Sequence, residues 1–283
     1  MPQWNCDCPV CRGARIGTKV ARASQASLAV SADGEHWFLI NASPDLRQQI
    51  LDNPLLHPRQ GVRHSPIAGV VLTNGDVDAI AGLLTLREGW PFTIHASPGV
   101  LQILRSNSIF NVLSPAMVDR QAFALEQPFA LLLPDGRNSG LSVTAFAVPG
   151  KEPLYLEGSG VAGETVGLRI EGPDSHFHFV AACAAITPEL SRRLRGTPLL
   201  FFDGTLWRDD EMIAGGLGAK TGRRMAHMSM KSSIAELRSL EIGRKIFLHI
   251  NNSNPAWVED SPERRELHRA GWEIPRDGSE IGL

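Results

Sequence analysis

The segment IAGVVLTNGDVDAIAGL, residues 67–83, joins an apolar run to a helical pattern through a short polar turn. IAGVVLT is continuously apolar, which is typical of a strand buried in a sheet. Asn74, Gly75 and Asp76 form the turn, and DVDAIAGLLTLREG has the apolar spacing of a helix. Functional side chains of α/β proteins gather at such strand ends, so this segment predicts both an α/β fold and the position of a site.

The same alternation of strands and helices continues on both sides of this segment. Upstream, two strands surround a turn at Asp33 and Gly34, and a helix follows at DLRQQIL. Between residues 120 and 180 the pattern is rich in strands. Further strands are expected at FTIHAS, LLFFDGTLW and KIFLHINNSNP. Further helices are expected at SPGVLQILRSN, ITPELSRRLRGTP and KSSIAELRSLE. We therefore expect one α/β domain over residues 1–283, with stacked sheets and outer helices.

Composition narrows the class of protein. The 283 residues are 43% hydrophobic and carry a net charge of −2 with no strongly basic half, so no nucleic-acid surface is expected. No apolar run approaches the about 20 residues of a membrane-spanning helix, and no secretory signal is visible. We therefore expect a cytoplasmic protein that binds neither membranes nor nucleic acids. Thiols stay reduced in that compartment, and clustered cysteines then indicate metal binding before disulfides.

Cys6, Cys8 and Cys11 form a C-x-C-x-x-C cluster near the N-terminus. Such close spacing lets three thiolates reach one ion without closing a long loop, and structural zinc takes four such ligands in a tetrahedron. The cluster therefore predicts a structural zinc site whose fourth ligand comes from elsewhere in the chain. Unrelated free thiols and a redox pair are the alternatives.

The redox alternative depends on the local structure around the thiols. Redox C-x-x-C pairs usually open a helix, whereas Pro9 and Gly13 lead us to expect a non-helical knuckle. Cys183 lies in HFHFVAACAAI, an expected buried strand, where a lone cysteine is typical core filler. We therefore expect Cys183 in the core and not at the zinc.

Polar side chains follow three of the expected strands. Asp78 comes after the first, Asp203 ends the second and His249 follows the third, with His227 in the glycine-rich loop between the last two. A set of Asp and His ligands with open positions suits Fe(II), Mn(II) or Zn(II), so we expect a shared metal site. The alternatives are a helix cap for Asp78, a turn for Asp203, a backbone hydrogen bond for His227 and a core position for His249.

The segment TNGDVDAIAGL resembles the T-H-x-H-x-D-H-x-x-G-L signature of the metallo-β-lactamase superfamily. Asn74 and Asp76 stand where the signature has its first two histidines, Asp78 keeps the aspartate, and Ala79 replaces the last histidine. FFDGT and FLHINNSNP resemble the strands that carry the superfamily's bridging aspartate and final metal histidine. The resemblance implies a metallo-β-lactamase-like αββα sandwich, which is an α/β fold.

PQWNCDCPVC, LTLREG and FFDGTLW extend the likeness over essentially the full length, and the chain resembles the pyrroloquinoline quinone biosynthesis protein B family. Members usually begin with a strand and a glycine-rich loop before PQWNC, so we expect the N-terminal strand of the sandwich to be missing here. Related proteins with a cysteine knuckle take their fourth zinc ligand three residues after the final metal histidine, which implies Asn252. Superfamily relatives often pair, so a homodimer is expected.

The resemblance also implies a role in making pyrroloquinoline quinone (PQQ). The implied reaction is iron-dependent hydroxylation of the tyrosine ring in a precursor derived from Glu and Tyr. Asp78 and His249 would hold the iron, and Asp203 and His227 would shape or complete the site. Arg87, Arg223 and Arg224 are candidates for binding the carboxylates of this quinone precursor, since guanidinium groups suit carboxylates, although a solvated surface position is the alternative for each.

Two other functions remain as alternatives. The first is a non-catalytic carrier that assists transport of PQQ or its precursor towards the periplasm, which the loss of a histidine at Ala79 favours. The second is a hydrolase with two zinc ions, which needs about five or six strong ligands. Asn74, Asp76 and Ala79 make that ligand set poor.

Overall fold

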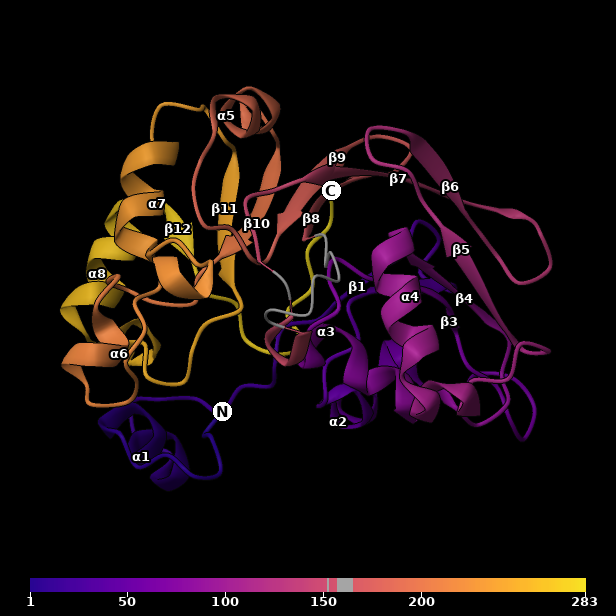
Figure 1. Ribbon diagram of the computed structural model, residues 1–283, viewed down its shortest axis with the longest axis horizontal. Helices are drawn as coiled ribbons and strands as arrows, with labels where there is room; N and C mark the ends of the chain where they lie inside the picture. The colour runs from indigo at the N-terminus through magenta and orange to yellow at the C-terminus, as the bar shows by residue number, and fades with distance from the viewer. Residues whose placement is uncertain (152, 157–164) are drawn as a thin grey trace. The chain divides into compact units, whose positions relative to one another are not determined.

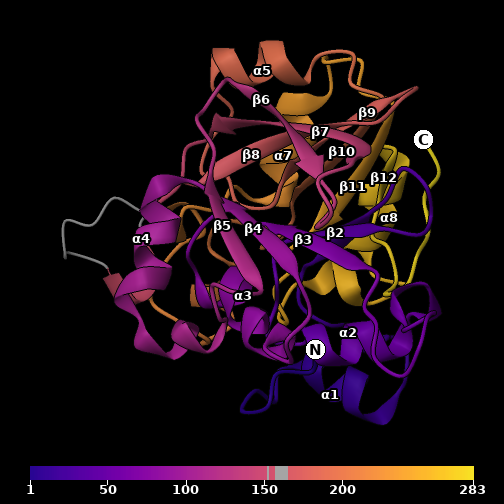
Figure 2. The same ribbon diagram turned by 90° about the vertical axis from the view of Figure 1, so that its right-hand side faces the viewer.

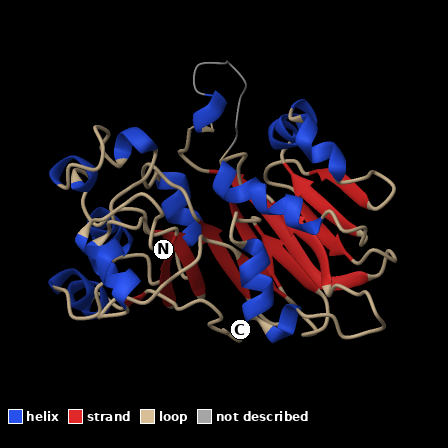
Figure 3. Ribbon diagram, turned by 90° about the horizontal axis from the view of Figure 1, so that it is seen from below, coloured by secondary structure: helices blue, strands red, loops and turns tan. Residues whose placement is uncertain are grey.

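The computed structural model describes residues 1–151, 153–156 and 165–283 (Figure 1). None of the helices in these ranges combines the length and the apolarity that crossing a membrane requires. The chain contains both strands and helices (Figure 3), as the α/β expectation requires.

The chain divides into two compact units. Unit 1 contains Met1–Ser24, Val148–Gly150 and His176–Gly282, whereas unit 2 contains Gln25–Ala147 and Lys151–Ser175. The expectation that residues 1–283 act as one domain stays a prediction.

Unit 2 contains a five-stranded sheet in the order β1-β2-β3-β4-β5, of which Figure 2 labels β2 to β5. β1 and β2 are antiparallel on either side of Asp33 and Gly34, as predicted, and the other neighbours are parallel. The sequence pattern predicts no strand at β5, because its sequence VDRQA is mostly polar, as edge strands often are. In chain order the strands span Leu28–Val30, Trp37–Ile40, Ile67–Val71, Phe92–Ala96 and Val118–Ala122.

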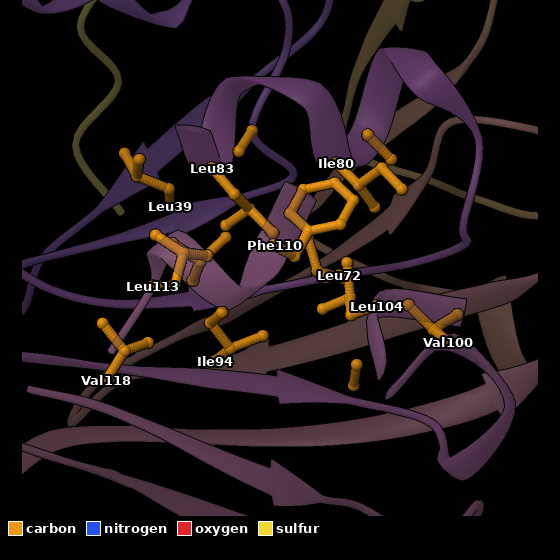
Figure 4. Packing of buried hydrophobic residues seen from close by; sticks show 14 of the residues in the cluster. Leu39, Leu72, Ile80, Leu83, Ile94, Val100, Leu104, Phe110, Leu113 and Val118 are labelled. Carbon is orange, nitrogen blue, oxygen red and sulfur yellow. The ribbon is translucent and has the colours of Figure 1, made fainter. Parts of the chain in front are cut away.

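Helices cover this sheet through apolar side chains. α4, Pro98–Ser106, packs on β4 and β5, and the Ser97 hydroxyl caps its first turn by accepting a hydrogen bond from the Val100 N–H. Leu83 and Ile94 are fully buried in the cluster between the sheet and the helices (Figure 4). Burying such a side chain stabilises the fold by about 1.5–3 kcal/mol. The remaining helices of unit 2 include α2, Leu46–Asp52, and the 3-10 turns η1, Pro54–Leu56, η3, Ser108–Val112, and η4, Leu154–Leu156.

The helix after β3 is shorter than expected. One continuous helix is predicted here, but α3 covers only Val77–Ile80, and a 3-10 helix, η2, continues over Ala81–Leu86. A Cβ on Gly82 would lie 2.1 Å from the carbonyl oxygen of Ser43, and the Gly82 N–H donates to the Ala42 oxygen at 2.8 Å. The glycine of the signature is therefore required because two backbone segments approach too closely for a side chain.

An antiparallel ladder forms the other part of unit 2. β6, Pro128–Leu132, pairs with β7, Asn138–Ala147, and β7 pairs with β8, Val166–Glu171. Leu141, Val143 and Ala145 are buried while Ser142 and Thr144 between them are more exposed, which is the period of a half-buried strand.

Unit 1 is built on four parallel strands, in which β10 pairs with β9 and β11, and β12 pairs with β11. They span His176–Val180, Leu199–Asp203, Arg244–Leu248 and Trp272–Glu273 for β9 to β12. Phe202 and Phe247 are fully buried, and the ring of Phe247 stacks on Trp272 with centroids 3.9 Å apart. The helices are α1, Pro9–Ile16, α5, Pro188–Leu194, α6, Glu211–Ala214, η5, Arg223–Met225, α7, Met230–Leu237, η6, Pro255–Trp257, and α8, Pro262–Arg269.

Candidate metal centres

Two groups of side chains in the described residues offer ligand atoms that lie within 4.8 Å of one another. Both groups belong to unit 1. The cysteine cluster is Cys6, Cys8 and Cys11, and the histidine centre is Asp203, His227 and His249.

The cysteine cluster opens a helix, so the expected non-helical knuckle is wrong. Cys8 is the N-cap of α1, and its Sγ accepts a hydrogen bond from the Cys11 N–H at 3.4 Å. Pro9 is compatible with the first turn because no intrahelical donor is needed there. Gly13 lies inside the helix, where a Cβ would come within 3.0 Å of the Val20 side chain. The two residues predicted to prevent a helix therefore fit into one.

Asn252 lies against the cysteine cluster. Its side-chain Nδ2 is 3.2 Å from the Cys11 Sγ, and its backbone oxygen is 3.8 Å from the Cys8 Sγ. Rotating the amide by half a turn exchanges its nitrogen and oxygen, and the choice between them depends on what the cluster holds. Three thiols with an adjacent amide fit the tetrahedral zinc site that the spacing predicts, and the role of Asn252 as the fourth ligand stays a prediction.

The thiols differ in how readily they ionise. Burial raises the pKa of Cys8 to about 11. Burial also acts to raise the pKa of Cys6, but hydrogen bonds from the Cys8 backbone and from the side chains of Cys8 and Cys11 outweigh it and lower that pKa. Because metals bind thiolates, a metal ion bound here would displace protons, and its affinity would rise with pH.

Parallel pairing of β10 with β11 brings the histidine centre together. Asp203 is the last residue of β10 and pairs with Leu248, so His249 follows at the same edge of the sheet. His227 comes from the loop before α7, and its ring stacks on that of His249 with centroids 5.2 Å apart and an interplanar angle of 19°. The predicted glycine-rich loop thus delivers one imidazole to the strand ends, although it also contains α6 and η5.

Asp203 is fully buried and accepts hydrogen bonds at both carboxylate oxygens. Oδ1 accepts from the Thr205 N–H at 3.0 Å and from the Thr205 hydroxyl at 2.7 Å. Oδ2 accepts from the Cys183 N–H at 3.0 Å and lies 2.8 Å from His227 Nδ1. Burial alone would raise the pKa of Asp203. The charge of His227 and its hydrogen bond to the carboxylate outweigh burial, His249 and Thr205 act in the same direction, and the pKa is lowered. The centre therefore holds an ionised carboxylate inside unit 1.

His249 has a strained backbone. Its φ is +53°, in the left-handed region that residues with a Cβ rarely occupy. The flanking backbone is held on both sides, because the Gly204 N–H donates to the Leu248 oxygen at 2.8 Å and the Asn251 N–H donates to the Thr205 oxygen at 2.9 Å. Such strain persists where the surroundings impose it, and it concentrates at functional sites.

The loop after His249 is anchored by two polar side chains. Asn254 is fully buried, and its Nδ2 donates to the Gly204 oxygen at 3.1 Å. Ser253 donates to the Glu211 Oε1 at 2.7 Å, and burial raises the pKa of Glu211. Because Asn252 directly precedes these anchors, one short loop contacts both the β10 end and the cysteine cluster.

The signature segment lies in unit 2. Asn74 Oδ1 accepts a hydrogen bond from the Asp76 N–H at 2.9 Å, and Asp78 lies in the first turn of α3. Ala79, which stands in place of a signature histidine, is buried in the apolar cluster of unit 2. The expectation that Asp78 shares a metal with His249 stays a prediction.

The arginines proposed for substrate binding are all exposed. Arg87 donates to the Leu84 oxygen at 2.8 Å and forms an ion pair with Glu88 at 3.2 Å. Arg223 and Arg224 lie in η5, close in sequence to His227. Their roles with a substrate stay predictions.

Comparisons with known proteins agree on one family. A family model described as the beta-lactamase superfamily domain matches residues 36–250. Coenzyme PQQ synthesis protein B of Rhodopseudomonas palustris (strain TIE-1) is 58% identical over 295 aligned residues, which cover 100% of this chain and 96% of that protein. The protein of the same name from Methylorubrum extorquens (strain PA1) is 48% identical over 292 residues, with coverage of 100% and 96%.

Solved structures agree with this family. The Zn(2+)-bound PqqB from Methylobacterium extorquens has a TM-score of 0.94 at 49% identity and covers 100% of this chain and 95% of its own. A diphosphatase from the PhnP family has a TM-score of 0.69 at 21% identity, covering 100% and 92%, and shares the fold. These matches confirm the predicted metallo-β-lactamase fold. The chain belongs to the coenzyme PQQ synthesis protein B family of the β-lactamase superfamily.

Proposed function

We propose that this chain acts in PQQ synthesis by hydroxylating the tyrosine ring of the Glu-Tyr-derived precursor at an iron site. The role in PQQ synthesis is supported by the names of relatives that are 48–58% identical over the full length of the chain. The reaction is supported chiefly by one observation, which is the pair of stacked imidazoles, His227 and His249, at the edge of the sheet.

Two histidines and one carboxylate form the ligand set of non-haem Fe(II) oxygenases. His227 and His249 supply the imidazoles in this proposal, Asp78 supplies the carboxylate that the signature predicts, and Asp203 stays hydrogen-bonded to His227. Iron held by these residues would supply the activation of O₂ beside a bound phenol. One oxygen atom would be inserted into a ring C–H bond to give the hydroxyl group, and the other would leave as water with two protons and two electrons from an external two-electron reductant.

The remaining residues bind and orient the precursor. Arg223 and Arg224 lie in η5, only a few residues before His227, so they are the nearest guanidinium groups in sequence for its carboxylates. Ring hydroxylation needs the phenol held within reach of the centre, and binding of its carboxylates supplies that orientation.

The test begins with anaerobic loading of the purified chain with Fe(II). Iron content is measured first, and then O₂ and precursor are added with a reductant, and the product is examined for a gain of one oxygen atom. His227→Ala, His249→Ala and Asp78→Asn are expected to lose iron and turnover, while His268→Ala, an exposed histidine of α8, keeps both. Full turnover by iron-free protein, or by the His249 variant, contradicts the proposal.

We also propose that Cys6, Cys8 and Cys11 hold a structural zinc ion with Asn252 as the fourth ligand. The solved relative contains Zn(2+), and the three sulfurs here lie within the reach of one ion. Zinc per chain should fall in Cys11→Ser. Asn252→Ala should still bind zinc, but a lower chelator concentration than for the wild type should remove it. Asn252→Asp should resist the chelator at least as well as the wild type. Unchanged chelator resistance in Asn252→Ala would reject the amide as a ligand.

A non-catalytic carrier is the second candidate. Ala79 is buried among apolar side chains, so one histidine of the signature has no counterpart at that position. Binding of PQQ to the metal-free chain with unchanged affinity, together with no consumption of O₂ by the iron-loaded chain, would favour the carrier over the enzyme.

A further inference from the structure

Thr205 lies at the middle of the histidine centre. It follows the end of β10 by two residues, and it is almost fully buried. Its Oγ1 is 2.7 Å from Asp203 Oδ1, 2.9 Å from His249 Nδ1, 3.0 Å from His227 Nδ1 and 3.1 Å from the His249 backbone oxygen. One hydroxyl therefore contacts all members of the centre.

Counting protons determines the direction of these hydrogen bonds. A hydroxyl has one proton and two lone pairs. The carboxylate of Asp203 and the backbone oxygen of His249 can only accept, so the Thr205 proton goes to an oxygen, and the Asp203 Oδ1 is the nearer one. The two Nδ1 atoms must then donate their protons to the lone pairs of Thr205 Oγ1.

His227 has a second acceptor that requires the same tautomer. Its Nδ1 lies 2.8 Å from Asp203 Oδ2, which as a carboxylate oxygen also only accepts. Both rings consequently carry a proton on Nδ1, and in the neutral form of each ring the lone pair is on Nε2. Metal-binding histidines are commonly set in this way by an oxygen that accepts from the other ring nitrogen.

We propose that Thr205 is a positioning residue whose hydroxyl holds His227 and His249 as Nδ1–H tautomers, so that both Nε2 atoms are presented to a metal ion. This inference rests on the proposed function only in taking the histidine centre as a metal site. The tautomers themselves are a property of the metal-free chain, which allows the two proposals to fail separately.

The test is an NMR measurement of the tautomers in the full chain with ¹⁵N-labelled histidine and no metal, at neutral pH. His227→Gln and His249→Gln assign the signals. The wild type should show protonated Nδ1 and unprotonated Nε2 in both rings. Protonated Nε2 in both wild-type rings would overturn the inference without any variant of Thr205.

Variants then separate the hydroxyl from the fold. Thr205→Val should shift His249 towards the Nε2–H tautomer but leave His227, which keeps Asp203, unchanged, and Thr205→Ser should restore the wild-type pattern. The matched control is Thr197→Val, because the Thr197 hydroxyl lies 2.7 Å from His178 Nδ1 in the same unit and should affect only that ring.

Metal affinity gives an independent readout. Zn(II) competition against a chelator should show binding at the histidine centre weakened about 10- to 100-fold in Thr205→Val, the usual effect of removing such a partner, and nearly unchanged in Thr205→Ser. Equal affinity in the wild type and in Thr205→Val, with both folded by circular dichroism, would overturn the inference. Nδ1–H tautomers with normal Zn(II) affinity but no iron-dependent turnover would uphold it and count against the proposed function.

Discussion

Replacing His249 by glycine is expected to leave the protein more stable than replacing it by alanine. His249 has a φ of +53°, and a residue with a Cβ pays about 1–2 kcal/mol in that conformation. Both substitutions remove the imidazole and its contact with Thr205, so those losses cancel when the two variants are compared. Only alanine keeps the backbone strain.

The size of the difference follows from two opposing terms. Glycine avoids the strain of about 1–2 kcal/mol but loses about 0.5–1 kcal/mol more backbone entropy on folding. His249→Gly should therefore exceed His249→Ala by about 1 kcal/mol in the free energy of unfolding. With a urea slope of about 1–3 kcal/mol per M, the unfolding midpoint should rise by roughly 0.3–1 M.

The assay is urea unfolding of both variants in the presence of a chelator, followed by tryptophan fluorescence. Ala235→Gly is the matched control, because Ala235 lies in α7 within the same unit, where glycine should destabilise by about 1 kcal/mol. A midpoint for His249→Gly at or below that of His249→Ala, with the control behaving as expected, would refute the reasoning about strain.

Three further predictions concern other parts of the chain. Burial lowers the pKa of His95 from 6.5 to about 4, so as the pH falls this histidine takes up its proton in the unfolded chain before it does so in the folded chain. Between pH 7 and pH 4 the wild type should therefore lose up to about 3 kcal/mol more of its free energy of unfolding than His95→Phe, measured by urea unfolding at each pH. Gly82→Ala should lower the free energy of unfolding by about 3 kcal/mol, because its Cβ would lie 2.1 Å from the backbone oxygen of Ser43. Gly172→Ala, whose Cβ would have its nearest atoms at 3.9 Å, should stay within about 1 kcal/mol of the wild type in the same assay. Removing zinc with a chelator should speed hydrogen exchange in α1 and in residues 251–254 and leave β4 unchanged, and equal effects on all three would contradict a local role for the cysteine cluster.

The loop after His249 contacts both candidate metal centres. Asn252 contacts the Cys11 sulfur, and Asn254 contacts the backbone at Gly204, next to the buried Asp203. The same loop therefore begins at the strained backbone of His249 and carries the residue that contacts the cysteine cluster.

Local patterns in the sequence determined much of the fold. The apolar run of β3, the turn at Asp33 and Gly34 and the cap at Ser97 depend on neighbours within a few residues, so their signals are readable without any tertiary contact. The spacing of the cysteines is local in the same sense. The positions of Asp203 and His249 at strand ends also followed from pattern, because parallel strands end at one edge of a sheet.

Only the tertiary structure decided the features that depend on distant partners. Thr205 meets His249, 44 residues away, and Asn254 meets the backbone of Gly204, 50 residues away. The left-handed backbone of His249 and the short α3 beside Gly82 arise because neighbouring segments impose them against local preference. No local pattern encodes such contacts, since they form only when packing brings separate strands and loops to the same place.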